Sequence, residues 1–187
     1  MRADELAERV NQALAEANVA GGNVFGFRKW PSNVEDMPLV LVGLPDDDKV
    51  SQGAIGAPSF TVTAAVPVTA RVTAPLETGD VGAGVCWDQL GALRTQIEIA
   101  VINAPCVMSV IQQYAYVRSR VKVSEDGRQY VGELSMVFGL EFYQDADDFY
   151  PAPDDDLAEV QVTTRLTDPP TPPATITGPS LKIDLPT

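Results

Sequence analysis

The chain has 187 residues, with 26 acidic and 13 basic side chains and a formal net charge of −13. That length suits one domain with an appendage, and the negative charge argues against a protein that wraps nucleic acid. No apolar run approaches the roughly 18 residues of a membrane span, and the first residues lack the pattern of a signal peptide. We therefore expect a protein made and assembled in a cytoplasm, with no membrane partner.

The first predicted elements are an amphipathic helix and two short strands. Residues 3–17 carry apolar side chains at helical spacing, and Gly21-Gly22 is expected to end this helix. Residues 24–29 are a strand candidate, and the apolar run 38–44 predicts a buried strand. The aspartates that follow are expected to open a loop that lasts from residue 45 to about residue 58.

A long strand and a second helix follow. Residues 59–74 alternate apolar side chains with mostly threonine, and Pro67 implies an edge position or a bulge because proline cannot donate to a ladder. The glycines of residues 75–84 predict a loop. Residues 85–103 predict a helix that stops at Asn103-Ala104-Pro105. Its expected apolar stripe is Trp87, Leu90, Leu93, Ile97 and Val101.

Residues 110–143 predict one very long β-hairpin, which is the most informative feature of the chain. Its turn contains Asp126-Gly127, a favoured type I′ pair, and centring the turn there fixes the register of both arms. On one face, that register pairs Ile111 with Phe142, Ala115 with Phe138, Val117 with Met136 and Val123 with Tyr130. A shift of one residue would scramble this sorting of apolar and polar side chains.

The length of this hairpin has consequences for burial. An arm of about 15 residues runs roughly 50 Å at about 3.3 Å per residue, whereas ordinary strands have about 5 or 6 residues. We expect the hairpin either to bend or to overhang and find a partner. Overhang is more typical of an assembly protein than of an enzyme.

The second face of the predicted hairpin carries the basic patch of the chain. Its members are Tyr114, Tyr116, Arg118, Arg120 and Lys122, with Gln112 beside them and Glu133 opposite Arg120. Three interpretations stay open: contact with nucleic acid by charge and stacking, docking on an acidic face of a neighbouring subunit, or a solvated side partly paired with Glu133. The global charge opposes the first. The candidate interface residues are Tyr116, Arg118, Arg120, Lys122 and Glu133.

Motifs for catalysis, cofactors and metals are weak in this sequence. Histidine is absent, which removes the commonest general base and metal ligand. The glycines of 79–84 lack the Lys-Ser/Thr pair of a phosphate loop. A calcium loop beginning at Asp145 would have Tyr150 where glycine is needed. Cys86 and Cys106 are expected to be small buried side chains. We expect no enzyme activity, no cofactor and no metal.

The C-terminal part of the chain changes character. Eight of the 15 prolines fall in residues 151–187, and residues 141–187 hold ten acidic side chains against two basic ones. This composition predicts an extended acidic, proline-rich tail and no second packed domain. Residues 160–166 and 181–185 resemble short strands that could add to a sheet edge of this or a neighbouring chain. The chain is thus expected to divide into an α+β domain, 1–150, and an extension, 151–187.

The predicted fold class of the domain is α+β, a mainly antiparallel sheet with both helices on one face. Its elements together resemble the tail-terminator, or tail-completion, proteins of long-tailed bacteriophages. The resemblance is carried by the helix 4–17, the strand-loop-strand stretch to Ala74, the helix 87–103 ending Ile-Asn-Ala-Pro, and the hairpin closing in Phe138-Gly-Leu-Glu-Phe-Tyr143. It covers about residues 1–150 and consists of an order of elements, without a diagnostic motif.

The resemblance implies a structural virion protein of the viral tail or neck that forms a homohexameric ring without catalysis. Such a ring caps the tail tube and joins it to the head, so the implied partners are other copies of the chain, the tail tube protein, a head-completion or neck protein and, in a contractile tail, the sheath. DNA would pass through the lumen without specific binding. Two alternatives stay open: a head–tail connector or minor capsid adaptor, and a small-ligand-binding α+β domain.

Overall fold

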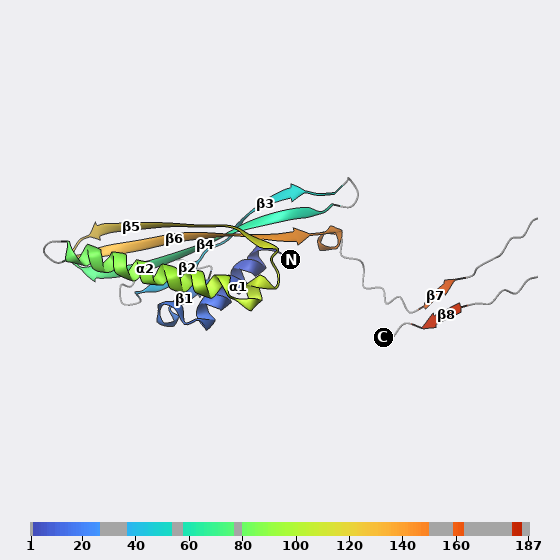
Figure 1. Cartoon of the computed structure of the whole chain (residues 1–187), viewed down its shortest axis with the longest axis horizontal. Helices are drawn as coiled ribbons and strands as arrows, with labels where there is room; N and C mark the ends of the chain where they lie inside the picture. Colours follow the sequence, from blue (N-terminus) through green and yellow to red (C-terminus); the bar gives the residue numbers. More distant parts are fainter. Residues whose placement is uncertain are drawn as a thin grey trace, which may run out of the picture. The chain divides into compact units, whose positions relative to one another are not determined.

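Figure 1 shows the computed structural model of the chain, which describes residues 2–26, 37–53, 58–76, 80–149, 159–162 and 181–184. The chain divides into two units, Met1–Phe149 and Tyr150–Thr187. The larger unit contains helices α1 (Ala3–Glu16), α2 (Val81–Ile102) and α3 (Pro105–Met108). Its strands are β1 (Val24–Gly26), β2 (Leu39–Val42), β3 (Asp46–Ser51), β4 (Phe60–Pro75), β5 (Gln113–Asp126) and β6 (Gln129–Gln144).

The six strands form one sheet in the order β1-β2-β4-β6-β5, and β3 also pairs with β4. Every pairing is antiparallel except that of β1 with β2. The predicted α+β class, with a mainly antiparallel sheet, is therefore confirmed. Strand β3 and the β1–β2 pair occupy the same side of β4, while β5 lies at the opposite edge of the sheet.

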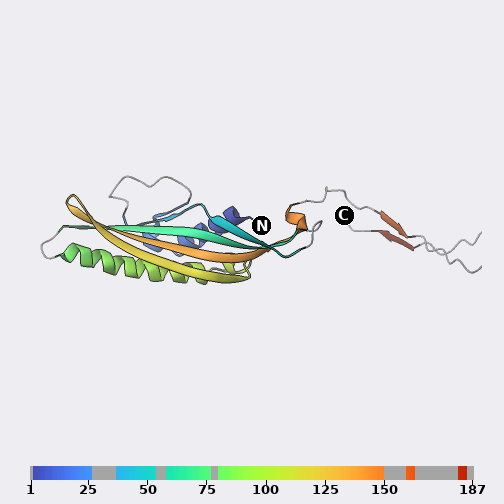
Figure 2. The ribbon, with the colours of Figure 1, turned by 90° about the horizontal axis from the view of Figure 1, so that it is seen from above.

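The long hairpin of β5 and β6 is present, and a strand of matching length runs beside it. Strand β4 pairs with β6 over all 16 positions, from Phe60 opposite Gln144 to Pro75 opposite Gln129. Figure 2 shows that β5 and β6 curve together as they pass α2. Both expected outcomes are seen in the described residues: the hairpin bends, and Figure 1 shows the end of β6 running past the helices together with β3 and the start of β4.

One face of the sheet, which we call the inner face, is covered by the helices. The even-numbered side chains of β4 from Val62 to Ala74, and those of β6 from Leu134 to Phe142, are almost completely buried there. They form a single core with α1 and α2, to which Leu6, Leu14, Leu90 and Ile97 contribute fully buried side chains. Burial of these side chains is the main favourable term in the folding of this unit.

The hairpin register differs from the prediction by two residues. Asp126 pairs with Gln129, so the two-residue loop is Gly127-Arg128, and Gly127 has a φ of +64° that glycine adopts without strain. Val117 consequently lies opposite Phe138, not Met136. A slip of two residues leaves every side chain on its own face, which is why the alternation of the sequence could not reveal it.

A β-bulge at Ala115 separates two tyrosines that were predicted to share a face. The register shifts between Tyr114 and Tyr116. The extra residue of a bulge turns the side chains before it to the other face of the sheet. The hydroxyl of Tyr114 donates to the carbonyl oxygens of Val101 and Ile102, at 3.1 and 3.2 Å, at the end of α2. Tyr114 therefore belongs to the helix side, and the prediction that placed it in the basic patch is wrong.

Strand β3 corrects the prediction of a loop from residue 45 onward. Its first residues are Asp46-Asp47-Asp48, which have low strand propensity, yet all six residues pair with β4 from Asp46 opposite Ala65 to Ser51 opposite Phe60. Pairing with a long neighbouring strand here outweighs local propensity. Pro67 sits where β2 ends and β3 has not begun, and its carbonyl accepts from Gly43 N at 2.8 Å. It lies in an interior strand, but between the end of β2 and the start of β3, so its missing N–H falls outside the ladders of both strands.

Helix α2 begins four residues earlier than predicted and includes two of the glycines assigned to a loop. Gly82 is buried, and a Cβ there would lie 2.2 Å from the carbonyl oxygen of Pro75, so glycine permits the close approach of helix and strand. The expected apolar stripe is correct except at Trp87, which is 53% exposed, while Cys86 is buried in the core.

In the second unit, β7 (Glu159–Val162) pairs antiparallel with β8 (Leu181–Asp184). The two strand-like pieces of the tail were considered candidates for addition to a sheet edge, but they pair with each other. The rest of residues 151–187 and the end of the strand predicted over 24–29 lie outside the described residues.

Candidate assembly surfaces

The described residues contain no group of three or more side chains placed to hold a metal ion. Asp145, the start of the hypothetical calcium loop, instead accepts a hydrogen bond from Asp147 N at 3.2 Å and begins a short 3₁₀ turn. Burial raises the pKa of the Cys86 thiol, which opposes the thiolate that nucleophilic cysteine chemistry requires. In the described part of the chain, no helix is long and apolar enough to cross a lipid bilayer.

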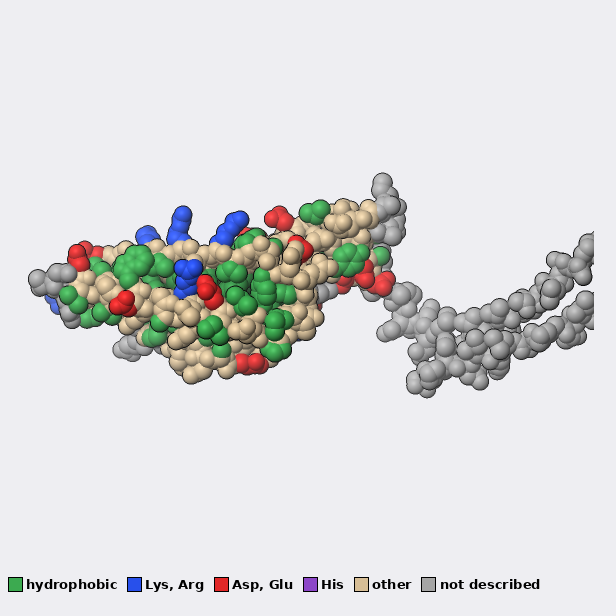
Figure 3. Space-filling view, viewed as in Figure 1, with side chains coloured by type: hydrophobic (Ala, Val, Ile, Leu, Met, Phe, Trp, Pro, Cys, Tyr) green, Lys and Arg blue, Asp and Glu red, His purple; other side chains and the backbone are tan. Residues whose placement is uncertain are grey.

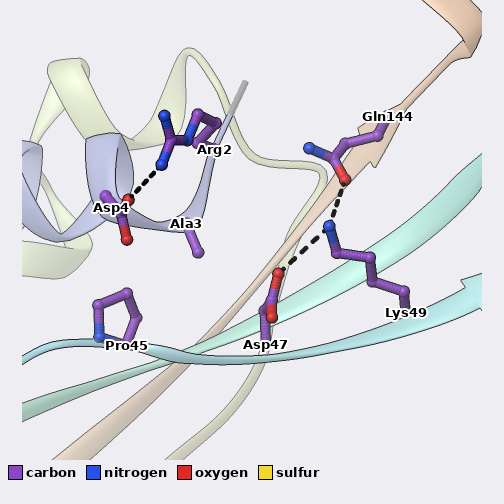
Figure 4. Close-up of a pocket in the computed structure, with 7 residues that line it drawn as sticks. All are labelled: Arg2, Ala3, Asp4, Pro45, Asp47, Lys49 and Gln144. Carbon is purple, nitrogen blue, oxygen red and sulfur yellow. Dashed lines mark hydrogen bonds and ion pairs between the residues drawn. The ribbon is translucent and has the colours of Figure 1, made fainter. Parts of the chain in front are cut away.

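A hollow of about 270 Å³ lies between the start of α1, strand β3 and the end of β6. Figure 4 shows that its charged side chains point toward one another. Arg2 pairs with Asp4 at 2.9 Å, and Lys49 contacts both Asp47, at 3.4 Å, and Gln144 Oε1, at 3.0 Å. Because these polar groups already bond to one another, few of them are left to bind a ligand.

The basic residues predicted to share one face of the hairpin do so in the structure, but Tyr114 does not lie with them. We call Tyr116, Arg118, Arg120 and Lys122 the basic stripe; they alternate along β5 on the face opposite the helices, which we call the outer face. The three cations are exposed, and among the described residues none of them forms an ion pair. The guanidinium of Arg118 lies 4.4 Å from the ring centroid of Tyr116. Figure 3 shows Lys and Arg side chains standing out along this border of the molecule.

Glu133, the fifth predicted interface residue, lies next to the basic stripe but has another partner. Arg71 on β4 donates to Glu133 Oε2 through Nε at 2.8 Å and through Nη2 at 2.6 Å. The register places Lys122, not Arg120, opposite Glu133. Its carboxylate is thus held by the sheet itself, and the prediction that it faces Arg120 is wrong.

Strand β3 presents the opposite charge at the other side of the sheet. Asp46, Asp47 and Asp48, which we call the acidic edge, are all exposed. Asp46 and Asp48 pair with Ala65 and Thr63, whose side chains lie on the outer face. Asp47 points to the inner side, where it meets Lys49. In the part of the chain that the structure describes, β4 is the sole strand partner of β3, so its second border is free.

The solvent side of α2 is the third surface. The helix has 22 residues, of which three are charged, and Arg94 and Glu98 pair with each other at 3.0 Å. Its outward face carries a row of exposed apolar side chains, Val81, Val85, Ala92 and Ile99, with Gly84 and Gly91 beside them and the exposed polar residues Asp88, Gln89 and Gln96 among them. Ile99 is 58% exposed and Val85 is 41% exposed. Exposed apolar side chains that follow one side of a helix in this way are typical of a contact surface.

Sequence reasoning found the basic stripe and missed the other two surfaces. The acidic edge was hidden because its aspartates were assigned to a loop. The outward face of α2 could have been found from one signal: a long predicted helix with few charged residues, on which apolar side chains must also face water. The five predicted interface residues do lie on one face, although Glu133 is occupied by Arg71.

Comparisons with known proteins show a similarity of structure. No protein-family profile matches the chain, and no curated protein matches it. Among solved structures, a chain from the virion of a native gene transfer agent particle aligns with a TM-score of 0.43 and 12% sequence identity. The alignment covers 72% of this chain and 93% of that chain.

Proposed function

We propose that this protein is a structural virion subunit that assembles into a closed ring and acts, without catalysis, as a tail terminator that caps the tail tube and joins it to the head. The observation that carries the proposal is the outward face of α2. It exposes Val85 and Ile99 on a helix with almost no charge, and apolar surface of this kind is typical of protein–protein interfaces.

Two further features support assembly over ligand binding. Among the described residues, β5 on one side of the sheet and β1 and β3 on the other each have one strand partner and therefore a free edge, and such edges are usually blocked or paired. The charged side chains that line the hollow beside α1 pair with one another. The net charge of −13 also suits a conduit that DNA passes without being bound.

The first test is the oligomeric state of the whole chain by native mass spectrometry and sedimentation. We expect a discrete closed oligomer near six chains, and a strict monomer at all concentrations would contradict the proposal. The variant Val85→Lys/Ile99→Lys should weaken assembly at least tenfold, because two charges would be desolvated in an apolar contact. Met108→Lys, at an equally exposed apolar residue on α3, is the matched control.

The terminator role is tested separately from the ring. Purified ring added to polymerising tail tube protein should stop tube growth and remain at one end of the tube in electron micrographs. A ring that leaves tube growth unchanged would remove the terminator role and favour the connector alternative. The Val85→Lys/Ile99→Lys variant, if it no longer forms rings, should lose the capping effect in parallel.

A further inference from the structure

Three strands of the sheet, β1, β3 and β5, have a single strand partner among the described residues. Two of these free borders, β5 and β3, carry opposite charges on the same face. The basic stripe lies on β5, and Asp46 and Asp48 lie on β3 with their side chains on the outer face. The rest of the molecule does not neutralise either set: Arg118, Arg120 and Lys122 form no ion pair with described residues, and both aspartates are exposed. Figure 3 shows the Lys and Arg side chains projecting from the border along which β5 runs in Figure 1.

The backbone of both borders is available for pairing. In β5, the closing pair of a two-residue hairpin exchanges both of its hydrogen bonds, and bonded pairs then alternate. Since Asp126 and Gln129 close this turn, the N–H and C=O groups of Val117, Ser119 and Val121 point away from β6. These three positions form an unpaired ladder edge in the middle of the strand.

The same alternation applies to β3. Gln52 N donates to Ser59 O at 2.8 Å, so the bonded positions of β3 are those in phase with Gln52, which include Asp46 and Asp48. The backbone groups of Asp47 and Lys49 therefore point away from β4. On each border, charged outer-face side chains flank backbone groups that lack a described partner.

We propose that β5 of one copy adds to β3 of the next copy, with the basic stripe opposite the acidic edge. This inference rests on the proposed ring and adds a strand-to-strand contact to the one proposed for α2. It is heterologous, because a border meets a different border, and heterologous contacts close into rings when the rotation permits. Pairing β5 with β5, or β3 with β3, would set like charges directly opposite each other, which disfavours a two-fold dimer.

The direction of the strands agrees with this arrangement. Strand β3 is antiparallel to β4, β4 to β6, and β6 to β5, so β3 and β5 run in opposite directions within one copy. Within one copy, the registers place Asp46 level with Tyr116 and Asp48 level with Gln113. A neighbouring copy that is shifted by about four residues along the strands, as happens when strands tilt against the axis of a ring, brings β3 antiparallel to β5 with Asp46 and Asp48 opposite Arg120 and Arg118. Continuing the sheet in this way keeps the cations and the aspartates on one common outer face.

The experiment exchanges the charges of the two borders in separate variants of the whole chain. Arg118→Glu/Arg120→Glu makes both borders acidic, and Asp46→Lys/Asp48→Lys makes both borders basic. Each variant alone should need at least about tenfold more protein for half-assembly, because like charges now meet at every contact. An equimolar mixture should recover assembly, since each acidic border then finds a basic border on the other variant.

Native mass spectrometry of the mixture gives a sharper outcome, because restored rings must alternate and contain equal numbers of the two variants. Glu8→Lys/Glu16→Lys on α1 changes the net charge by the same amount as the aspartate variant and should assemble like the wild type. Circular dichroism verifies that every variant is folded. If the wild type forms rings and both variants still form them equally well, or if the folded variants fail to rescue each other, the β5–β3 contact is wrong while the ring survives. A monomeric wild type would instead remove the proposed function itself.

Discussion

The two faces of strand β6 show how differently the sides of this sheet are used. On the inner face, Leu134, Met136, Phe138, Leu140 and Phe142 are at most 1% exposed beneath the helices. On the outer face, the same strand presents Glu133, Ser135, Val137, Gly139 and Glu141, which no helix covers. The fold is therefore held from one side, and the outer face and the borders carry charges that contribute little to the stability of a single chain.

The largest expected change in the free energy of unfolding comes from a substitution on the inner face of β6. Phe138→Ala removes a fully buried ring from the core and should lower the free energy of unfolding by about 3–5 kcal/mol. Val137→Ala, one residue away on the outer face, should cost less than about 1 kcal/mol. Urea unfolding followed by circular dichroism measures both. Similar losses for the two variants would mean that the outer face is also a core.

A second comparison lies within α2, between a glycine against the sheet and a glycine toward solvent. Gly82→Ala would place a Cβ 2.2 Å from the carbonyl oxygen of Pro75 and 2.8 Å from the ring of Tyr130, so we expect a loss of about 1–3 kcal/mol from overpacking. Gly84→Ala meets no atom within 4 Å and should stabilise the monomer by about 0.4–1 kcal/mol. Thermal unfolding of the two variants should shift in opposite directions, and a shift in the same direction would contradict the packing described for Gly82.

The start of α2 also shows why part of the fold could not be predicted from the sequence. Glycines usually indicate a loop, and nothing local reveals that Gly82 serves a contact with Pro75, a strand residue seven positions earlier. The loop predicted in place of β3 was wrong for the same kind of reason, because pairing with β4 holds its aspartates in a strand. The long strand, the hairpin and the core side of both helices were predictable, because hydrophobic periodicity reports burial directly.

The candidate surfaces could likewise be predicted only in part from the sequence. The basic stripe could be predicted because an alternating strand sorts its side chains by face whatever its exact register. The pairing of Glu133 with Arg71 required knowledge of which strand lies next to β6. The bulge at Ala115 gave no sequence signal, so Tyr114 and Tyr116 looked equivalent although they lie on opposite sides of the sheet.

The smallest effect on stability separates these two tyrosines. Tyr114→Phe removes a hydroxyl that donates to the end of α2, where the carbonyl oxygens of Val101 and Ile102 are 3.1 and 3.2 Å away. The expected loss is about 1 kcal/mol, since these carbonyl groups would lose a partner. Tyr116→Phe keeps the ring that lies over Gly139 and beside Arg118, and should leave the free energy of unfolding within about 0.5 kcal/mol.

Urea unfolding of the two phenylalanine variants in parallel measures this difference, with identical chemistry removed on each side of the bulge. If the strand ran without the bulge, Tyr114 would lie with Tyr116 on the outer face, and the two variants would be equally stable. A loss confined to Tyr114→Phe would instead fix the bulge at Ala115 and, with it, the position at which the basic stripe begins. Because the stripe starts one residue after that bulge, its alignment with a neighbouring border depends on the same backbone irregularity.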